Sequence, residues 1–282
     1  SMVFCKYTYA IYKINQFIAF FMKLSVIGLG VVGKACLRGF KKLGHECVGI
    51  DLKNIKEIDK ILSSEIIYIC LPVPFNKKKI LDDKLIDKYL NYLNKHKYRG
   101  IVAIKSTIVP GRTNYFKKKF SNIKICFVPE FLRERFAFAD FTNNHELLIV
   151  GTSSKYIFNK IKKSHGIYPK KIIMTKDINA ELIKIYSNTY NAYRIMFSNI
   201  FFELSKKLDF NYSEILNIYL KRNLSKGYYL KCENNLRGYA GTCLPKDMNA
   251  LNLILKKNKI NFNTIESIIK DNNKIKKTVF KG

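Results

Sequence analysis

Lys23-Leu-Ser-Val-Ile-Gly-Leu-Gly-Val-Val-Gly33 is the stretch that decides the fold of this chain. Its first five residues are typical of a buried β-strand, and three glycines follow in the pattern G-x-G-x-x-G. A helical pattern then runs over residues 31–43 and ends at Gly44. Gly28 permits a tight turn, Gly30 lets the backbone approach a pyrophosphate, and Gly33 lets helix and strand pack closely. The stretch therefore predicts the nucleotide-binding turn of a Rossmann-type α/β domain.

The acidic residue at the end of the second predicted strand indicates which dinucleotide is bound. Asp51 follows the apolar run 46–50 and lies 18 positions after Gly33. A carboxylate at this place accepts hydrogen bonds from the ribose hydroxyls and repels a 2′-phosphate. We therefore expect NAD rather than NADP, with Val31 and Val32 also at the cofactor. The alternative is a glycine-rich turn that binds nothing.

Strands and helices alternate from the first strand to residue 175 or so. Further strands are expected at 65–70, 101–104, 123–128, 147–150 and 171–174, with helices at 82–96, 112–120 and 153–164. This alternation predicts a doubly wound parallel sheet.

The pattern changes after residue 176. A helix without Pro or Gly is expected over 177–208, followed by helices at 212–221, 245–256 and 263–277. We predict a Rossmann NAD-binding domain over 22–175 and an all-helical second domain over 176–282, which serves dimerisation and substrate binding. Residues 1–21 are interpreted as an extension that is poorly ordered.

Composition narrows the function classes. The chain has 282 residues, of which 48% are hydrophobic and 26% charged, and this excludes wholesale disorder. The 51 Lys and Arg against 21 Asp and Glu favour anionic partners. The alternative is a coding bias that places lysine on solvated faces, which the even spread of lysines along the chain favours. No aromatic-basic motif supports nucleic-acid binding, which we do not expect.

Membrane, metal and disulfide classes are not favoured. The apolar segment 2–21 is interrupted by Lys6 and Lys13 and is too short to span a bilayer. Seven cysteines, no C-x-x-C pair and four scattered histidines give no metal-ligand spacing. We expect no membrane partner, no metal and a cytoplasmic location.

Four segments occur in an order that resembles a known family: Lys105-Ser-Thr107 with Pro110-Gly111, Pro129-Glu-Phe-Leu-Arg-Glu134, Lys184 with Asn188, and Cys243-Leu-Pro-Lys-Asp247. Together they resemble the UDP-glucose/GDP-mannose dehydrogenase family, most closely its UDP-glucose 6-dehydrogenases, from about Met22 to Lys277. The resemblance implies oxidation of a nucleotide sugar, UDP-glucose first, at C6 to the uronic acid with two NAD.

Cys243 is the candidate nucleophile of this chemistry. It would trap an aldehyde as a thiohemiacetal, which a second hydride transfer converts to a thioester. Pro245 suits the first turn of a helix, so the helix dipole and Lys246 would favour the thiolate. Asp247 lies four positions on, and by resemblance it assists the base step or orients a water. The alternative is a buried structural thiol.

Lys184 and Asn188 share one face of the long helix because they are four positions apart. By resemblance Lys184 stabilises the developing oxyanion and Asn188 holds the sugar or a water. Thr107 and Glu130 would hold the attacking water, with Glu130 as general base for thioester hydrolysis. The alternatives are a solvated helix face for Lys184 and Asn188, and a salt bridge with Arg133 or Arg135 for the two glutamates of the second segment.

The resemblance also implies further contacts. Additional cofactor contacts are Lys56, Val73, Ser106, Thr107, Glu134 and Lys246. Substrate contacts are Glu130, Phe131, Leu132, Arg133, Glu134, Lys184, Asn188, Tyr239 and Gly241.

The sequence also departs from the family. Members usually carry a third, UDP-binding domain, and we expect this chain to lack it because it stops at Gly282. Segment 52–64 is short and lacks a strand, while Val73 and Ala240 replace a usual threonine and glycine. We expect a homodimer through helix 177–208 to supply the missing wall. Two competing hypotheses are a single-step β-hydroxyacid-type NAD dehydrogenase and an inactive NAD-binding paralogue.

Overall fold

The computed structural model describes residues 21–51, 55–74, 81–221, 229–241, 243–260 and 263–275, without the side chains of 55–58, 200 and 207. The chain divides into two compact units, unit 1 with residues 1–73 and 82–182 and unit 2 with residues 74–81 and 183–282. All but the last residue of the predicted extension 1–21 lies outside the described residues.

Unit 1 is built on a seven-stranded sheet with the order β2-β1-β3-β4-β5-β6-β7. The strands are β1 (Lys23–Ile27), β2 (Glu46–Ile50), β3 (Ile66–Ile69), β4 (Ile101–Ile104), β5 (Lys124–Phe127), β6 (Leu147–Gly151) and β7 (Lys171–Thr175). Neighbours run parallel except β5 and β6, which pair antiparallel at Phe127 and Gly151. This confirms the predicted Rossmann-type sheet, with one antiparallel junction that the alternation pattern did not indicate.

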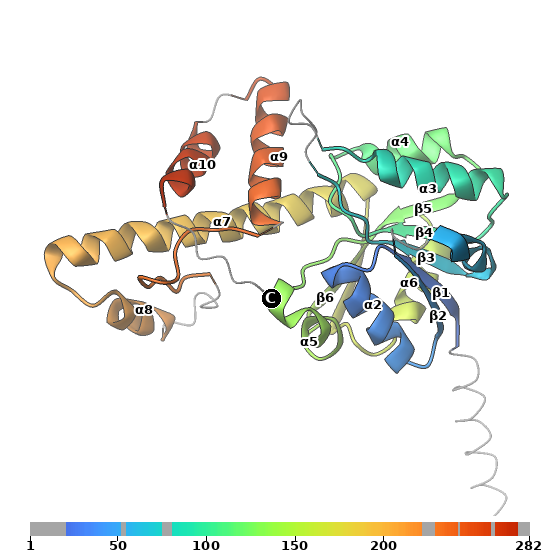
Figure 1. Ribbon diagram of the computed structural model, residues 1–282, viewed down its shortest axis with the longest axis horizontal. Helices are drawn as coiled ribbons and strands as arrows, with labels where there is room; N and C mark the ends of the chain where they lie inside the picture. Colours follow the sequence, from blue (N-terminus) through green and yellow to red (C-terminus); the bar gives the residue numbers. More distant parts are fainter. Residues whose placement is uncertain are drawn as a thin grey trace, which may run out of the picture. The chain divides into compact units, whose positions relative to one another are not determined.

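Helices cover both faces of the sheet. Helices α2 (Val31–Lys42), α5 (Ala137–Thr142) and α6 (Lys155–His165) lie on one face, and α3 (Lys84–Lys95) and α4 (Arg112–Lys119) lie on the other (Figure 1). Alternate strand residues point to each helix layer because strand side chains have a period of two. The largest core cluster joins Leu24 and Val26 of β1 with Phe40 of α2 and Phe141 of α5.

Two short segments of unit 1 were not expected from the sequence. The 3₁₀ segment η1 (Ile55–Ser63) occupies most of the stretch in which no strand was expected. The Tyr92 hydroxyl of α3 donates to Asp59 of η1, and this hydrogen bond joins η1 to α3. A second segment, η2 (Glu134–Phe136), leads into α5.

The described secondary structure of unit 2 is helical, apart from the isolated bridge between Glu233 and Leu236 and a bridge residue at Leu81. Helix α7 (Asp177–Leu208) begins in unit 1 and continues through residues 183–208 of unit 2. It is followed by α8 (Tyr212–Leu220), α9 (Leu244–Lys257) and α10 (Thr264–Lys274). A small core of Ala192, Met196, Tyr239, Met248 and Ile268 joins α7, α9, α10 and the segment before α9. Within the described ranges no helix is long and apolar enough to cross a membrane.

Candidate active site

The glycine turn of unit 1 is required by close packing. Gly28 has φ +93°, and a Cβ on it would lie 2.5 Å from the carbonyl oxygen of Cys70 at the end of β3. A Cβ on Gly33 would lie 1.8 Å from the carbonyl oxygen of Gly28. Any side chain at either position would push the helix or the neighbouring strand away. The first and third glycines of the motif therefore have the packing roles that the sequence predicted.

The second glycine leaves room for a ligand. Gly30 is the N-cap residue of α2, and a Cβ on it would meet no atom within 4 Å. In this part of the described chain, no side chain caps α2 and its first turn carries no acidic residue. The start of α2 is thus uncapped by a side chain and open at Gly30, which suits an anion at its N–H groups. Asp51 is exposed beyond the adjoining strand, where the Gly28 N–H donates to Ile50 O at 2.9 Å. These groups fit the pyrophosphate and ribose of NAD.

The loops after β3 and β4 are tied together beside this turn. The Ser106 hydroxyl lies 2.7 Å from Leu71 O and 3.3 Å from Ile69 O, so it donates to the backbone at the end of β3. Ser106, Thr107 and Val73 are all buried. The predicted cofactor contacts of these three residues stay predictions. The side chain of Lys56, another predicted contact, lies outside the described side chains.

Glu130 forms a buried ion pair with Lys105. The Lys105 Nζ lies 2.8 Å from Glu130 Oε2, and the two side chains are only 1% and 7% exposed. Burial alone would raise the pKa of the Glu130 carboxyl, but Lys105 and His145 outweigh it and hold that pKa below its ordinary value. The same ion pair raises the pKa of Lys105 despite burial. Glu130 therefore remains ionised, and it is a weaker proton acceptor than an isolated carboxylate.

Lys105 is a partner of Glu130 that the sequence did not suggest. Arg133 makes a bidentate pair with Asp140, at 2.9 and 2.6 Å from the two carboxylate oxygens. The Arg133 N–H also donates to Asp140 at 3.0 Å, which fixes the start of η2. Phe131 and Leu132 are half-buried and Glu134 is exposed. The predicted substrate contacts along this segment stay predictions.

Three of the predicted catalytic residues meet in unit 2. Lys184 and Asn188 are both 8% exposed, so the alternative of a solvated helix face is wrong. The Asn188 Nδ2 donates to Asp247 Oδ2 at 2.5 Å, which joins α7 to the first turn of α9. Asp247 is completely buried, and within the described residues its Oδ1 has no hydrogen-bond partner. One carboxylate oxygen thus has unused hydrogen-bonding capacity inside the protein.

The environment of Asp247 makes it a stronger base. Burial raises the pKa of its carboxyl above the ordinary value, although Lys184, Lys246 and the Asn188 hydrogen bond all lower it. A buried carboxylate with a raised pKa accepts a proton more readily near neutral pH. The nearby Lys184 supplies a positive charge where an alkoxide would develop. The three side chains together can therefore remove a proton and stabilise the resulting anion.

Cys243 stands at the N-cap of α9, one turn before Asp247, whose N–H donates to Cys243 O at 2.9 Å. Its side chain is exposed, whereas Cys36, Cys126 and Cys232 are buried. The alternative of a buried structural thiol is therefore wrong for Cys243. Pro245 lies in the first helical turn, as predicted, so the thiol is placed at the positive end of the helix dipole.

The remaining predicted residues of unit 2 lie around this cluster. Lys246 is half-buried on α9, and Gly241 is exposed with φ +80°. Tyr239 is 3% exposed and its ring belongs to the small core of unit 2.

No role for Lys105 was predicted from the sequence, although the residue lies in the segment Lys105-Ser-Thr107. Lys105 directly follows β4, and Glu130 lies in the loop that follows β5. Because β4 and β5 are parallel neighbours, this placement could have indicated that the two residues form a pair.

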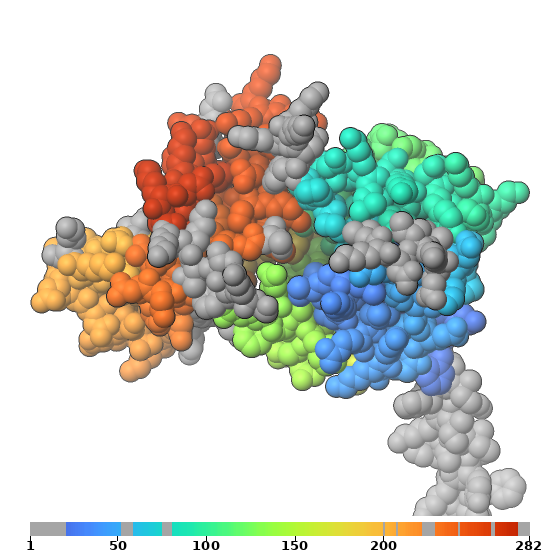
Figure 2. All heavy atoms as spheres, viewed as in Figure 1, coloured from blue at the N-terminus to red at the C-terminus, as the bar shows by residue number. Residues whose placement is uncertain are grey.

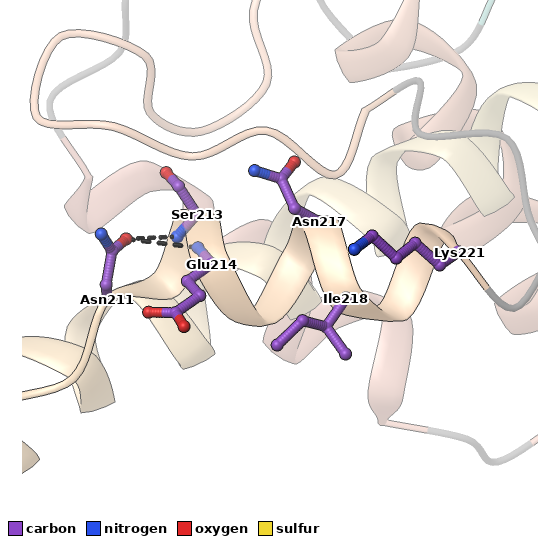
Figure 3. Close-up of a pocket in the computed structure, with 6 residues that line it drawn as sticks. All are labelled: Asn211, Ser213, Glu214, Asn217, Ile218 and Lys221. Carbon is purple, nitrogen blue, oxygen red and sulfur yellow. Dashed lines mark hydrogen bonds between the residues drawn. The ribbon is translucent and has the colours of Figure 1, made fainter.

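A pocket lies along α8 and the turn before it (Figure 3). It is lined by Asn211, Ser213, Glu214, Asn217, Ile218 and Lys221. The Asn211 side chain accepts from the N–H groups of Ser213 and Glu214 and so caps α8. None of the predicted catalytic residues lines this pocket.

Comparisons with known proteins identify a family that matches this chain. Two models of the UDP-glucose/GDP-mannose dehydrogenase family match the chain, the NAD binding domain over residues 55–170 and the central domain over residues 178–274. UDP-glucose 6-dehydrogenase of Rickettsia prowazekii is 29% identical over 296 residues, which cover 89% of this chain and 67% of that protein. GDP-mannose 6-dehydrogenase of Pseudomonas aeruginosa is 26% identical, with 82% of this chain and 63% of that protein covered.

A solved structure shares the fold. A UDP-glucose dehydrogenase from the archaeon Pyrobaculum islandicum matches with a TM-score of 0.79 at 20% identity, over 90% of this chain and 68% of that one. The chain thus spans about two thirds of the length of the proteins it is compared with here.

Proposed function

The chain belongs to the UDP-glucose/GDP-mannose dehydrogenase family, and we therefore propose that it oxidises C6 of a nucleotide sugar, UDP-glucose first, to the uronic acid. Its NAD-binding domain makes NAD the cofactor, which accepts one hydride in each of two oxidations. The observation that carries the proposal is the cluster of Lys184, Asn188 and Asp247 one helical turn from the exposed Cys243.

In the first oxidation Asp247 takes the proton of the C6 hydroxyl as hydride leaves the carbon. Its raised pKa and its unpartnered Oδ1 support this role. Lys184 stabilises the developing alkoxide, and Asn188 holds the Asp247 carboxylate in place through its 2.5 Å hydrogen bond. The product of this step is an aldehyde.

In the second oxidation the Cys243 thiolate adds to the aldehyde carbon and forms a thiohemiacetal. Loss of a second hydride from that carbon leaves a thioester, which water cleaves to a carboxylate and the regenerated thiol. One primary alcohol, one water and two NAD⁺ thus give one carboxylate, two NADH and three protons. Because Lys105 lowers the pKa of Glu130, we assign Glu130 to orienting the attacking water with Thr107, and not to storing its proton.

Product stoichiometry tests the proposal. NADH and uronic acid are measured with UDP-glucose, GDP-mannose and UDP-N-acetylmannosamine in parallel, and we expect two NADH per sugar with UDP-glucose as the best substrate. One NADH per substrate would favour the single-step β-hydroxyacid-type reaction, which needs no thiol. NAD binding without turnover of any sugar would favour the inactive paralogue.

A matched pair of cysteine variants tests the nucleophile. Cys243→Ser should lower the rate of uronic acid formation by about 10³-fold or more, because the thioester cannot form. Cys232→Ser, at a buried thiol of the same unit whose pKa burial raises to about 11, should retain the wild-type stoichiometry. Equal activity of Cys243→Ser and the wild-type protein would contradict the thioester route.

We also propose a homodimer through α7. An apolar stripe of exposed side chains follows one face of this helix at helical spacing: Tyr186, Tyr190, Tyr193, Phe197, Leu204 and Leu208. Figure 2 shows the C-terminal part of α7 and α8 at the surface, in gold. Exposed apolar faces of this kind are typical of interfaces, and a second copy is the partner that the predicted dimerisation role favours.

Sedimentation measures this assembly directly. Phe197→Glu, at a side chain 49% exposed in the middle of the stripe, should convert a dimer to a monomer. Ile167→Glu, at a side chain 86% exposed in unit 1, is the control and should leave the dimer intact. A wild-type monomer at micromolar concentration would contradict this assembly.

A further inference from the structure

One buried amide holds the backbone of the segment that leads to Cys243. The Tyr239 N–H donates to Asn272 Oδ1 at 2.8 Å, and the Asn272 Nδ2 donates back to Tyr239 O at 3.1 Å. Asn272 belongs to α10 and is 2% exposed. A single side chain thus satisfies both polar groups of one residue's backbone, as a neighbouring strand would.

The side chain of Tyr239 is a second anchor for this segment. Its ring is 3% exposed and packs in the core of unit 2 with Met196 of α7 and Met248 of α9. Burial raises the pKa of its hydroxyl to about 12, and this hydroxyl has no partner within the described residues. The segment is therefore fixed both by its ring and by its backbone.

The anchor lies between two glycines with positive φ and close to the catalytic cluster along the chain. Gly238 and Gly241 have φ of +59° and +80°, a region that favours glycine. Tyr239 precedes Cys243 by four positions, and Met248, in the same core, directly follows Asp247. The contact with α10 and the buried ring thus both hold the segment that leads to α9.

We propose that Asn272 is a positioning residue, which fixes the approach of the Cys243 thiol by clamping the backbone of Tyr239. The inference rests on the proposed function, in which Cys243 is the nucleophile. Displacement of a reacting group by about 1 Å can lower a rate about 10²-fold, so release of the clamp should reduce kcat strongly. NAD binds unit 1, so its KM should change little.

Hydrogen exchange tests the clamp itself. In Asn272→Ala the Tyr239 amide loses its buried acceptor, and its exchange should accelerate about tenfold, which corresponds to one lost hydrogen bond. Amides within α10 serve as the internal reference for global stability. Acceleration at Tyr239 beyond that of the α10 amides supports the clamp, and equal acceleration of both sets overturns it.

A second variant covers the case in which Asn272→Ala does not fold. Asn272→Asp keeps the acceptor for the Tyr239 N–H, and its carboxyl can donate to Tyr239 O only when protonated. We expect kcat near the wild-type value at low pH and at least about tenfold loss as pH rises and the carboxyl ionises. The ratio of variant to wild-type kcat at each pH is the readout. A ratio that does not change with pH overturns the proposal.

Asn258→Ala is the matched control. The Asn258 side chain is exposed and donates to Ile254 O at 2.7 Å near the end of α9. This variant therefore loses one side-chain amide hydrogen bond, whereas Asn272→Ala loses two. It should change neither Tyr239 exchange nor kcat. A loss of kcat in Asn258→Ala equal to that in Asn272→Ala would overturn the specific role of Asn272.

Failure of the proposed function can be recognised separately. If the wild-type protein forms no NADH with any nucleotide sugar, that function fails. The rate at which iodoacetamide alkylates Cys243 then replaces kcat as the readout. An alkylation rate in Asn272→Ala that differs from the rates of both the wild-type protein and Asn258→Ala supports the positioning role of Asn272. An alkylation rate between or equal to those two rates overturns that role.

Discussion

Replacement of Lys105 by Met should destabilise the protein strongly, because it leaves the Glu130 carboxylate buried without this cation. The two charges lie 2.8 Å apart with 1% and 7% of their side chains exposed. At an effective dielectric constant of about 20 their attraction amounts to about 6 kcal/mol. Part of that offsets the desolvation of the two charges, so we expect a loss of about 3–5 kcal/mol in the free energy of unfolding.

Urea unfolding at pH 7 measures this loss, and an exposed ion pair provides the control. Lys160 lies 2.6 Å from Glu65, with side chains 30% and 38% exposed. Lys160→Met should cost no more than about 1 kcal/mol because water screens that pair. If Lys105→Met costs no more than Lys160→Met, the reasoning about burial is refuted.

The stability of Lys105→Met should also depend on pH. Without Lys105, burial becomes the dominant effect and raises the pKa of Glu130 above its unfolded value. The folded variant then binds more protons than the unfolded chain, so its stability falls as pH rises through that raised pKa and recovers at acidic pH. The double variant Lys105→Met/Glu130→Gln removes the buried charge and should recover much of the loss at pH 7.

Three further outcomes are expected. Asp51→Ala should weaken NAD binding and reduce the preference for NAD over NADP, measured by fluorescence titration with both cofactors. Burial lowers the pKa of His45, His145 and His165 in the folded state. The free energy of unfolding should therefore fall as pH decreases below about 6.5, by up to about 1.4 kcal/mol per pH unit for each histidine. Urea unfolding between pH 5 and 7 measures this fall. Glu181→Ala should cost about 1–3 kcal/mol in thermal or urea unfolding, because this buried carboxylate accepts two N–H groups at the start of α4.

Local patterns in the sequence predicted the secondary structure of unit 1 well. The apolar runs 66–69 and 101–104 are strands as expected, because a parallel strand buried on both faces favours an uninterrupted apolar sequence. Helix α5 was missed because Ala137-Phe-Ala-Asp-Phe-Thr142 is short and alternates apolar and aromatic residues without a helical period. Its helical form depends on tertiary packing, since Phe141 fills the space that the absent side chain of Gly39 leaves on α2.

In the candidate site, contacts within one helix were predicted from the sequence, whereas a contact between two strands was not. The four-residue spacings of Lys184 with Asn188 and of Cys243 with Asp247 predicted shared helix faces, because such faces depend only on the helical repeat. The partner of Glu130 was not predicted, because Arg133 and Arg135 are near it in sequence while Lys105 comes from another strand. That pair depends on the adjacency of β4 and β5, which only the sheet order provides.

Burial of acidic residues affects how the protein meets a charged ligand in solution. Glu130, Asp140, Asp177, Glu181 and Asp247 are buried, which removes five of 21 negative side chains from the surface, whereas Lys105 and Lys184 are the two buried cations in the described chain. The exposed side chains are thus more one-sidedly positive than composition alone implies, while the net charge of +30 sets the long-range potential. A diphosphate would be drawn toward the protein before any contact forms, and its association should slow as added salt shortens the Debye length, about 8 Å at 0.15 M ionic strength.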